Sequence, residues 1–340
     1  MILIDSLYLN SFGGETILKL FLNQFKNTKI DLFILIDSRL PPFYLNLIEP
    51  NNYKVINASH FNRKRFYLEN KDKFSSILCL ANLPPPIFIN VKTTIYFHNL
   101  LLLHPFSHSI RFKNRLVNYF KFSYIKHHNH NDYIWVVQTQ YICKLLRDSL
   151  KINSEQVFIY PIFKEKFKLS RTKKTTNNFV YVSSGVSHKN HNRLLKAFIE
   201  AANKTDKEIN LHLTLDKEEL SFIKKYPKNL NIVMHGTLSE DGVNRLYNFN
   251  EFLIYPSLVE SFGLPLIEAT IHGCKVIASD LPYVHEIIKP SFTFDPYSAQ
   301  SISNAILKAV ERSNLPETKI LVENKLDNFI DYIISQDVQR

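Results

Sequence analysis

The chain is poor in glycine: it has seven in 340 residues, whereas average usage near 7% would give roughly two dozen. Because glycine accepts backbone angles and close contacts that other residues do not, we expect each one where a side chain is not tolerated. Most of them fall in predicted strand-to-helix loops, where open α/β folds bind ligands. The seven are Gly13, Gly14, Gly185, Gly236, Gly242, Gly263 and Gly273.

Cysteines are also few, and long apolar runs are absent. Cys79, Cys143 and Cys274 are odd in number and far apart, which favours reduced core thiols over a disulfide framework or a metal site. No run reaches the roughly 18 apolar residues that a membrane span needs. The opening residues 1–9 read as a buried strand and not as a signal peptide. We therefore expect a cytoplasmic location, including the inner face of the cytoplasmic membrane.

Acidic residues are scarce in the first half of the chain. Residues 1–165 carry 20 Lys and Arg against 11 Asp and Glu, so they contribute +9 of the net charge of +11. A basic half favours an anionic partner, such as membrane lipid or a phosphorylated glycan, although biased composition would give the same excess. No helix-turn-helix, zinc-finger or RNP pattern occurs, so we expect no nucleic-acid partner.

Residues 109–126 place basic and aromatic side chains at helical spacing. Two interpretations remain open for this segment. Such a helix can lie on an anionic membrane surface, or it can pack its apolar stripe on its own sheet and leave its lysines in water.

Short apolar runs alternate with helical patterns along the whole chain, which predicts an α/β fold with parallel sheets covered on both faces. The lysine-rich stretch 164–177 is predicted to be a linker between an N-terminal domain, 1–163, and a second domain, 178–316. A helix is predicted from 317, in a C-terminal segment 317–340. Strands are predicted at 1–9, 30–36, 53–56, 76–80, 93–97, 133–137, 178–184, 208–215, 231–234, 252–255, 275–278 and 292–294.

The most informative stretch is PSLVESFGLPLIEATIHG, residues 256–273. It follows a predicted strand and contains a loop and then a helix, which Pro265 opens and Gly273 ends. The N–H groups of Ser261, Phe262, Gly263 and Leu264 would lie at the helix N-terminus, where an anion is favoured.

Two carboxylates flank this predicted anion site. Glu260 lies in the loop and Glu268 about one turn into the helix. By itself such a spacing usually means two solvated glutamates. Beside an anion site, however, the carboxylates suit the vicinal hydroxyls of sugars, so the predicted ligand carries both phosphate and sugar.

This segment resembles the donor-binding signature of retaining GT-B glycosyltransferases of the family-4 type, the glycosyl transferases group 1. The flanking stretches HGTLSEDGVNRLYNFNEFLIYPS and GCKVIASDLPYVHEII resemble the same family, densely over 178–297 and more thinly over 1–160. The resemblance implies two Rossmann-like domains facing across a cleft, with the last helix crossing back to the first domain. It also implies hexosyl transfer from a nucleotide-diphosphate sugar to a glycan or lipid-linked acceptor, in cell-surface polysaccharide or lipopolysaccharide synthesis.

The resemblance assigns roles to residues of the second domain. Glu260 would contact the donor sugar, Glu268 the ribose, and the loop at Gly236 and Thr237 the base. Lys189 would bind the diphosphate, usually together with an arginine five residues earlier. That position is Ser184 here, which puts more of the phosphate charge on Lys189 and on backbone amides.

In the first domain, the resemblance places a histidine near the donor sugar and a glycine pair opposite the diphosphate. The matching residues are His98, which ends a predicted strand, and Gly13 with Gly14, which precede a helical pattern starting at Glu15. Local structure alone would also explain them, as a strand end and a tight turn. The third glycine of a dinucleotide fingerprint is missing, so NAD binding is not predicted.

No Asp-x-Asp motif occurs, so we expect a metal-independent enzyme whose only small-molecule requirement is its nucleotide-sugar co-substrate. Asn190 is predicted to cap the helix after Lys189.

Two alternative functions stay open. One is another enzyme on this architecture, such as a sugar-nucleotide epimerase or a phosphorylase. The other is a catalytically idle sugar-nucleotide-binding scaffold subunit, which Ser184 keeps plausible.

Overall fold

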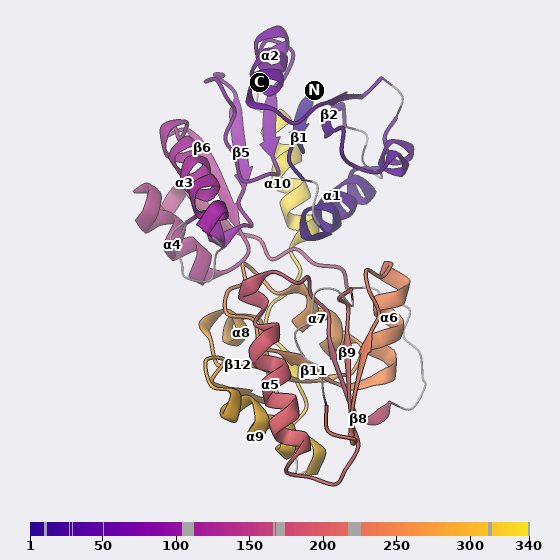
Figure 1. The fold of residues 1–340 in the computed structure, drawn as a ribbon. Helices are drawn as coiled ribbons and strands as arrows, with labels where there is room; N and C mark the ends of the chain where they lie inside the picture. Colours follow the sequence, from indigo (N-terminus) through magenta and orange to yellow (C-terminus); the bar gives the residue numbers. More distant parts are fainter. Residues whose placement is uncertain are drawn as a thin grey trace. The chain divides into compact units, whose positions relative to one another are not determined.

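The computed structural model describes residues 1–9, 12–26, 28, 30–49, 51–103, 112–165, 167, 174–216, 226–311 and 315–338. The described residues form two compact units (Figure 1). Unit 1 contains those up to Phe163 together with those from Glu323 onward. Unit 2 contains those from Lys164 to Val322. None of the described helices has the length and apolar character needed to cross a bilayer.

Unit 1 is built on a parallel sheet of seven strands in the order β3-β2-β1-β4-β5-β6-β7. The order reverses between β1 and β4, and the ligand crevice of such sheets lies at the carboxyl ends of the strands beside that reversal. The strands are β1 (Ile2–Asp5), β2 (Leu32–Asp37), β3 (Tyr53–Ile56), β4 (Ser76–Cys79), β5 (Lys92–Tyr96), β6 (Tyr133–Val137) and β7 (Val157–Ile159). The helices are α1 (Phe12–Phe25), α2 (His60–Asn70), α3 (Phe112–His127), α4 (Gln140–Leu150) and α10 (Leu326–Val338).

The C-terminal helix α10 belongs to unit 1, where it packs beside α1. Ile17, Phe21 and Phe25 repeat at helical spacing and are buried, so one face of α1 is apolar. The Phe21 ring meets Phe329 of α10 edge-on, with 5.5 Å between centroids. The N–H of Lys325 donates to the carbonyl of Pro161 at 2.8 Å, which fixes the start of α10 beside the end of the N-terminal segment.

The predicted start of the last helix, at 317, is wrong. Lys319–Ile320 form β15, which pairs antiparallel with β13 (Ile288–Lys289), and the helix begins only at Leu326. The side chain of Asn324 accepts a hydrogen bond from the N–H of Leu326 at 3.3 Å. Local strand pairing and this turn therefore take the chain out of helical geometry for the residues before 326.

Unit 2 has a second parallel sheet, of six strands in the order β10-β9-β8-β11-β12-β14, and its order reverses between β8 and β11. Thr175–Tyr181 form β8, so the last residues of the predicted linker are already strand. The other strands are β9 (Ile209–Leu213), β10 (Leu230–Met234), β11 (Asn250–Tyr255), β12 (Lys275–Ser279) and β14 (Phe292–Phe294). The helices are α5 (His191–Ala202), α6 (Glu240–Phe249), α7 (Leu264–Ile271), α8 (Pro282–Ile287) and α9 (Ala299–Glu311). The predicted α/β class with two parallel sheets is thus confirmed.

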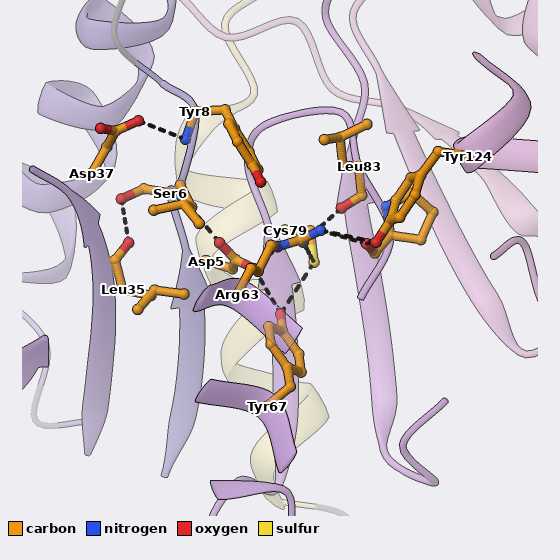
Figure 2. A network of polar contacts seen from close by, with 12 residues as sticks. Asp5, Ser6, Tyr8, Leu35, Asp37, Arg63, Tyr67, Cys79, Leu83 and Tyr124 are labelled. Atoms are coloured by element: carbon orange, nitrogen blue, oxygen red, sulfur yellow. Dashed lines mark hydrogen bonds and ion pairs between the residues drawn. The ribbon is translucent and has the colours of Figure 1, made fainter. Parts of the chain in front are cut away.

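The interior of unit 1 contains a buried ion pair that joins three parts of the unit (Figure 2). Arg63 of α2 donates through Nε to Asp5, at the end of β1, at 2.7 Å. Its terminal nitrogens donate to the carbonyls of Leu83 and Pro84, at 3.0 and 2.8 Å, in the loop after β4. Tyr67 donates to the same Asp5 oxygen at 2.8 Å. The network fixes the loop after β4 at the carboxyl edge of the sheet.

Removing one partner of this pair should destabilise unit 1 strongly. Arg63→Met leaves the carboxylate of Asp5, which is 1% exposed, without its cation, and an uncompensated buried charge costs about 3–5 kcal/mol. Urea unfolding followed by the fluorescence of Trp135, the single tryptophan, which is buried in unit 1, measures the change.

The matched control is Arg65→Met on the same helix. Arg65 is 69% exposed and pairs with Glu69 one turn away, so its loss should change the unfolding free energy by less than about 0.5 kcal/mol. Equal effects of the two substitutions would show that the Arg63 network does not stabilise the unit.

Candidate active site

Two loops at the carboxyl edge of the unit 2 sheet are tied together by hydrogen bonds. They follow β8 and β11, the strands on either side of the reversal in strand order. The N–H of Leu258 donates to the carbonyl of His188 at 2.9 Å. The side-chain amide of Asn190 donates to the carbonyls of Pro256 and Pro296, at 3.1 and 2.8 Å. These bonds bring Lys189 of the first loop against Glu260 of the second.

Asn190 therefore does not act as the predicted side-chain cap. It occupies the N-cap position of α5, but with φ +65° and no side-chain capping bond to a backbone N–H. Its Oδ1 accepts from the side chain of Arg193 in α5 at 2.7 Å, and its amide nitrogen holds the second loop and the turn before α9. The predicted N-cap position is therefore correct, but the cap is not made by a side-chain bond to the backbone.

Lys189 and Glu260 form a largely buried ion pair. The ammonium donates to Glu260 Oε1 at 2.6 Å, and the side chains are only 15% and 12% exposed. The hydroxyl of Tyr255 donates to the same oxygen at 2.9 Å. Burial alone would raise the pKa of Glu260, but the charge and hydrogen bond of Lys189, with a hydrogen bond from Ser257, bring it below its ordinary value. Glu260 is therefore ionised at neutral pH.

The predicted order of strand, loop and helix at residues 252–271 is confirmed. Gly263 is the N-cap of α7, and Pro265 lies in the first turn. Gly263 has φ +90°, and an added Cβ would lie 3.1 Å from a methyl group of Leu266. Only glycine fits both conditions. Gly263 makes no side-chain capping bond, and the first turn of α7, at Leu264, follows directly on the loop of Ser261 and Phe262.

Glu268, one turn into α7, is the second carboxylate of the predicted site. The Tyr247 hydroxyl donates to its Oε2 at 3.2 Å. Burial raises the pKa of Glu268 to about 7. The hydrogen bond from Tyr247 opposes the rise, the Glu240 charge adds to it, and the Lys164 charge opposes it more weakly. At neutral pH this carboxyl group changes between an acceptor and a donor of hydrogen bonds.

The remaining predicted residues of unit 2 lie at the same sheet edge, after the ends of β8 and β10. Gly236 has φ +65°, and a Cβ there would meet Asp216 Oδ1 at 2.8 Å; Thr237 beside it is exposed. Ser184 is exposed, and its carbonyl accepts from His191 at 3.1 Å. Ser184 adds no charge, so Lys189 is the cation that the structure places beside Glu260.

Three predicted residues lie in unit 1. His98 follows β5, with its Nε2 3.1 Å from the carbonyl oxygen of Leu80 and its N–H donating to Asn82 Oδ1 at 2.6 Å. Burial lowers the pKa of His98 to about 4, so its ring is neutral.

Gly13 and Gly14 lie in the first turn of α1, which starts at Phe12 and not at Glu15 as predicted. The pair is therefore helical, and neither glycine has positive φ. A Cβ on Gly14 would lie 2.9 Å from Leu9, whereas one on Gly13 would meet nothing within 4 Å. No described protein atom therefore excludes a side chain at Gly13.

Sequence reasoning missed the tyrosines that support the site. Tyr181 and Tyr255 end their strands and are fully buried, whereas the sequence pattern assigns them only to apolar runs. Their hydroxyls reach Lys189 and Glu260. A tyrosine at the carboxyl end of a buried strand is the available signal, because its apolar ring fits the core while its hydroxyl needs a polar partner.

Metal-binding side chains do not gather in the described part of the chain: no three His, Cys, Asp or Glu lie close enough to share an ion. The three cysteines are buried and free, as the sequence led us to expect.

Comparison with known proteins shows what the second half of the chain is similar to. Residues 162–325 match the model of the glycosyl transferases group 1. Over these residues, just under half of the chain, it is similar to that family. The O-antigen chain mannosyltransferase RfbU of Salmonella typhimurium is 26% identical over 198 residues, which are 55% of this chain and 50% of RfbU. The chain spans half or less of the length of the curated relatives that it matches.

Solved structures show the same architecture over the whole chain. WaaG, a glycosyltransferase involved in lipopolysaccharide biosynthesis, superposes with a TM-score of 0.66 at 14% identity, covering 100% of this chain and 96% of WaaG. HepE of Anabaena, in complex with UDP-glucose, gives 0.66 at 12% identity, with 99% and 97% covered. The fold of the chain is therefore GT-B.

The raised pKa of Glu268 predicts a pH-dependent stability. In the unfolded chain a glutamate ionises near pH 4.3, whereas in the folded protein Glu268 ionises near pH 7. Folding thus favours the protonated form, and the contribution of this group to stability is lost as pH rises from about 4.5 to about 7. Relative to wild type, Glu268→Gln should become more stable at pH 8 than at pH 5.

Urea unfolding of both proteins at the two pH values measures this difference. Glu311→Gln, at an exposed position in unit 2, is the control, and its effect should be the same at both. A Glu268→Gln effect that is also independent of pH would contradict the assignment.

Proposed function

We propose that the chain is a metal-independent, retaining glycosyltransferase that moves a hexose from a nucleotide-diphosphate sugar. The observation that carries the proposal is the Lys189–Glu260 pair at 2.6 Å, located in the loops beside the N-terminus of α7 with Glu268 one turn further on. A cation and a helix N-terminus suit phosphate groups, and two carboxylates suit hydroxyl groups. Together they match a ligand whose phosphates lie between two groups that bear hydroxyls, the sugar and the ribose.

In this proposal Lys189 and the backbone N–H groups at the start of α7 bind the donor diphosphate. Glu260 accepts hydrogen bonds from hydroxyls of the sugar, and Glu268 from those of the ribose. The loop at Gly236 and Thr237 holds the base. For His98, Gly13 and Gly14 we propose the roles that the resemblance implies, toward the sugar and the diphosphate.

Catalysis then follows from charge that develops during the reaction. The bond between the anomeric carbon and the phosphate oxygen breaks, and the leaving diphosphate gains negative charge. Lys189 and the α7 amides stabilise that charge more strongly than they stabilise the bound donor, which lowers the barrier. The acceptor hydroxyl attacks from the side of the leaving group and gives its proton to the departing phosphate, so the anomeric configuration is retained.

The proposed acceptor is a glycan or a lipid-linked precursor of a cell-surface polysaccharide or lipopolysaccharide. RfbU is an O-antigen chain mannosyltransferase, and WaaG is a glycosyltransferase of lipopolysaccharide biosynthesis. HepE was solved with UDP-glucose, so UDP-hexoses are the first donors to test, followed by GDP-sugars. The cytoplasm, where nucleotide sugars are made, is the proposed location.

An assay of sugar transfer, with and without an acceptor, separates two other functions from the proposed one. A sugar-nucleotide epimerase changes the donor sugar without any acceptor. An idle scaffold subunit binds the nucleotide sugar and turns over nothing, whatever acceptor extract is added.

Substitution of the ion pair should remove transfer. Glu260→Gln and Lys189→Ala are each expected to lower kcat about 10²- to 10³-fold, the usual effect of losing one preorganised electrostatic contact. Release of nucleotide diphosphate in the presence of acceptor extract measures the rate. Lys196→Ala, at an exposed position on α5, is the control and should transfer at the wild-type rate. Near-normal transfer by either site variant would refute the proposed roles.

The surface of α3 supports the proposed contact with an anionic membrane. Its residues 112–127 include no Asp or Glu, so the helix is basic throughout. Ile125 is buried, so part of the apolar stripe packs on the unit. Four large apolar side chains remain 44–68% exposed: Leu116, Val117, Tyr119 and Phe120. A basic helix with exposed apolar residues fits the surface of a bilayer that carries anionic lipids.

Flotation with lipid vesicles tests this contact. The protein is expected to float with vesicles containing phosphatidylglycerol and not with pure phosphatidylcholine. Phe120→Ser should weaken flotation several-fold, because it removes apolar area from the contact. Phe61→Ser is the control: Phe61 is 72% exposed but lies on α2. Equal loss in both variants, or flotation that does not depend on lipid charge, would contradict a role for α3.

A further inference from the structure

Three tyrosines form a buried layer beneath the Lys189–Glu260 pair. Tyr181, Tyr255 and Tyr283 are each less than 5% exposed. The Tyr255 ring meets Tyr181 at 5.5 Å and 85° and Tyr283 at 6.4 Å and 67°, so it is packed edge-on against both neighbours. Rings held in this way have little freedom to reorient, and the positions of their hydroxyls are correspondingly well defined.

The three hydroxyls have different partners. Tyr181 donates to the backbone carbonyl of Lys189 at 2.9 Å, and Tyr283 donates to the carbonyl of Ser257 at 2.8 Å. These two hold the backbone of the loops. Tyr255 instead donates to Glu260 Oε1 at 2.9 Å, and so it contacts a side chain of the site itself.

We propose that Tyr255 is a positioning residue for the transfer reaction, holding Glu260 ionised and aimed at the donor sugar when the diphosphate has drawn Lys189 away. The inference rests on the proposed function. Oε1 of Glu260 accepts from both Lys189 and Tyr255. A diphosphate that takes the ammonium leaves the carboxylate, 12% exposed, in need of its remaining donors.

Tyr255 is suited to this role because its hydroxyl stays neutral and can donate a hydrogen bond to the carboxylate. Burial, followed by the Glu260 charge, raises the pKa of the Tyr255 hydroxyl well above its ordinary value. The hydroxyl is therefore always protonated and serves as a donor. Its ring also lies 5.9 Å from the Lys189 ammonium, so the ammonium retains a favourable contact with the aromatic face.

The titratable groups that act on Glu260 come from the loop after β8 and from the layer beneath. Lys189 and His188 belong to the loop after β8. Tyr181, Tyr255 and Tyr283 lie beneath the carboxylate. Lys189 is the strongest of the influences that keep Glu260 ionised. A tyrosine substitution should consequently matter more once a donor is bound than in the free protein.

The test compares Tyr255→Phe with Tyr283→Phe, which removes a buried hydroxyl that donates to the carbonyl of Ser257. For Tyr255→Phe we expect kcat with UDP-hexose to fall about 10- to 100-fold, since a hydrogen bond to a charged group has that weight. The acidic limb of the kcat–pH profile should move to higher pH. Tyr283→Phe should leave the profile in place.

A second measurement needs no donor and no turnover. The side-chain carboxyl of Glu260 is followed by ¹³C NMR against pH, with Glu260→Gln used to assign the signal. In Tyr255→Phe the midpoint of the Glu260 titration is expected to move to higher pH. In Tyr283→Phe it is expected to be unchanged. An unchanged midpoint in Tyr255→Phe overturns the inference. A shifted midpoint in a protein that transfers no sugar from any donor would leave the Tyr255–Glu260 contact established and refute the proposed function.

Discussion

A lysine ammonium and a glutamate carboxylate, 2.6 Å apart and both mostly shielded from water, determine the chemistry of the unit 2 sheet edge. Withdrawing either charge from water alone would be strongly unfavourable, and each is tolerated because of the other. The rest of the edge is arranged around this requirement. The two loops are tied by backbone bonds, and Asn190, Tyr181 and Tyr283 each hold a carbonyl near the pair.

The parts of the fold that follow from local chemistry could be predicted from the sequence. Strands such as β3, β6 and β14 are short runs between breakers, and their bounds match the predicted ones. The start of α1 differs from the predicted one because glycine is a poor helix former, whereas in the structure Gly14 packs closely on the side chain of Leu9. The strand at Lys319–Ile320 depends on a partner at Ile288–Lys289, and two residues carry no periodicity from which to predict a strand.

The candidate site divides in the same way. Glu260, Gly263 and Glu268 are close in sequence within one strand–loop–helix unit, so their arrangement could be predicted from that unit. The contact between Lys189 and Glu260 joins residues 71 positions apart and depends on how two loops meet across the reversal in strand order. The strand pattern implies that both loops lie at one edge of the sheet, but not that the two side chains touch. The roles of Tyr255 and Asn190 depend on hydroxyl and amide geometry, which a single sequence does not reveal.

Because position 184 is a serine and not an arginine, Lys189 serves both Glu260 and the diphosphate in the proposed reaction. With an arginine there, one cation could bind the diphosphate while the lysine stayed with the glutamate. In this chain Lys189 is the cation that the structure shows beside Glu260, so in the proposed reaction the arrival of the diphosphate and the release of the carboxylate toward the sugar become a single event. A ligand with phosphate but no sugar would separate the pair and leave Glu260 poorly compensated. A complete donor supplies a new partner for each charge, and the ion pair thereby favours nucleotide sugars over free nucleotides.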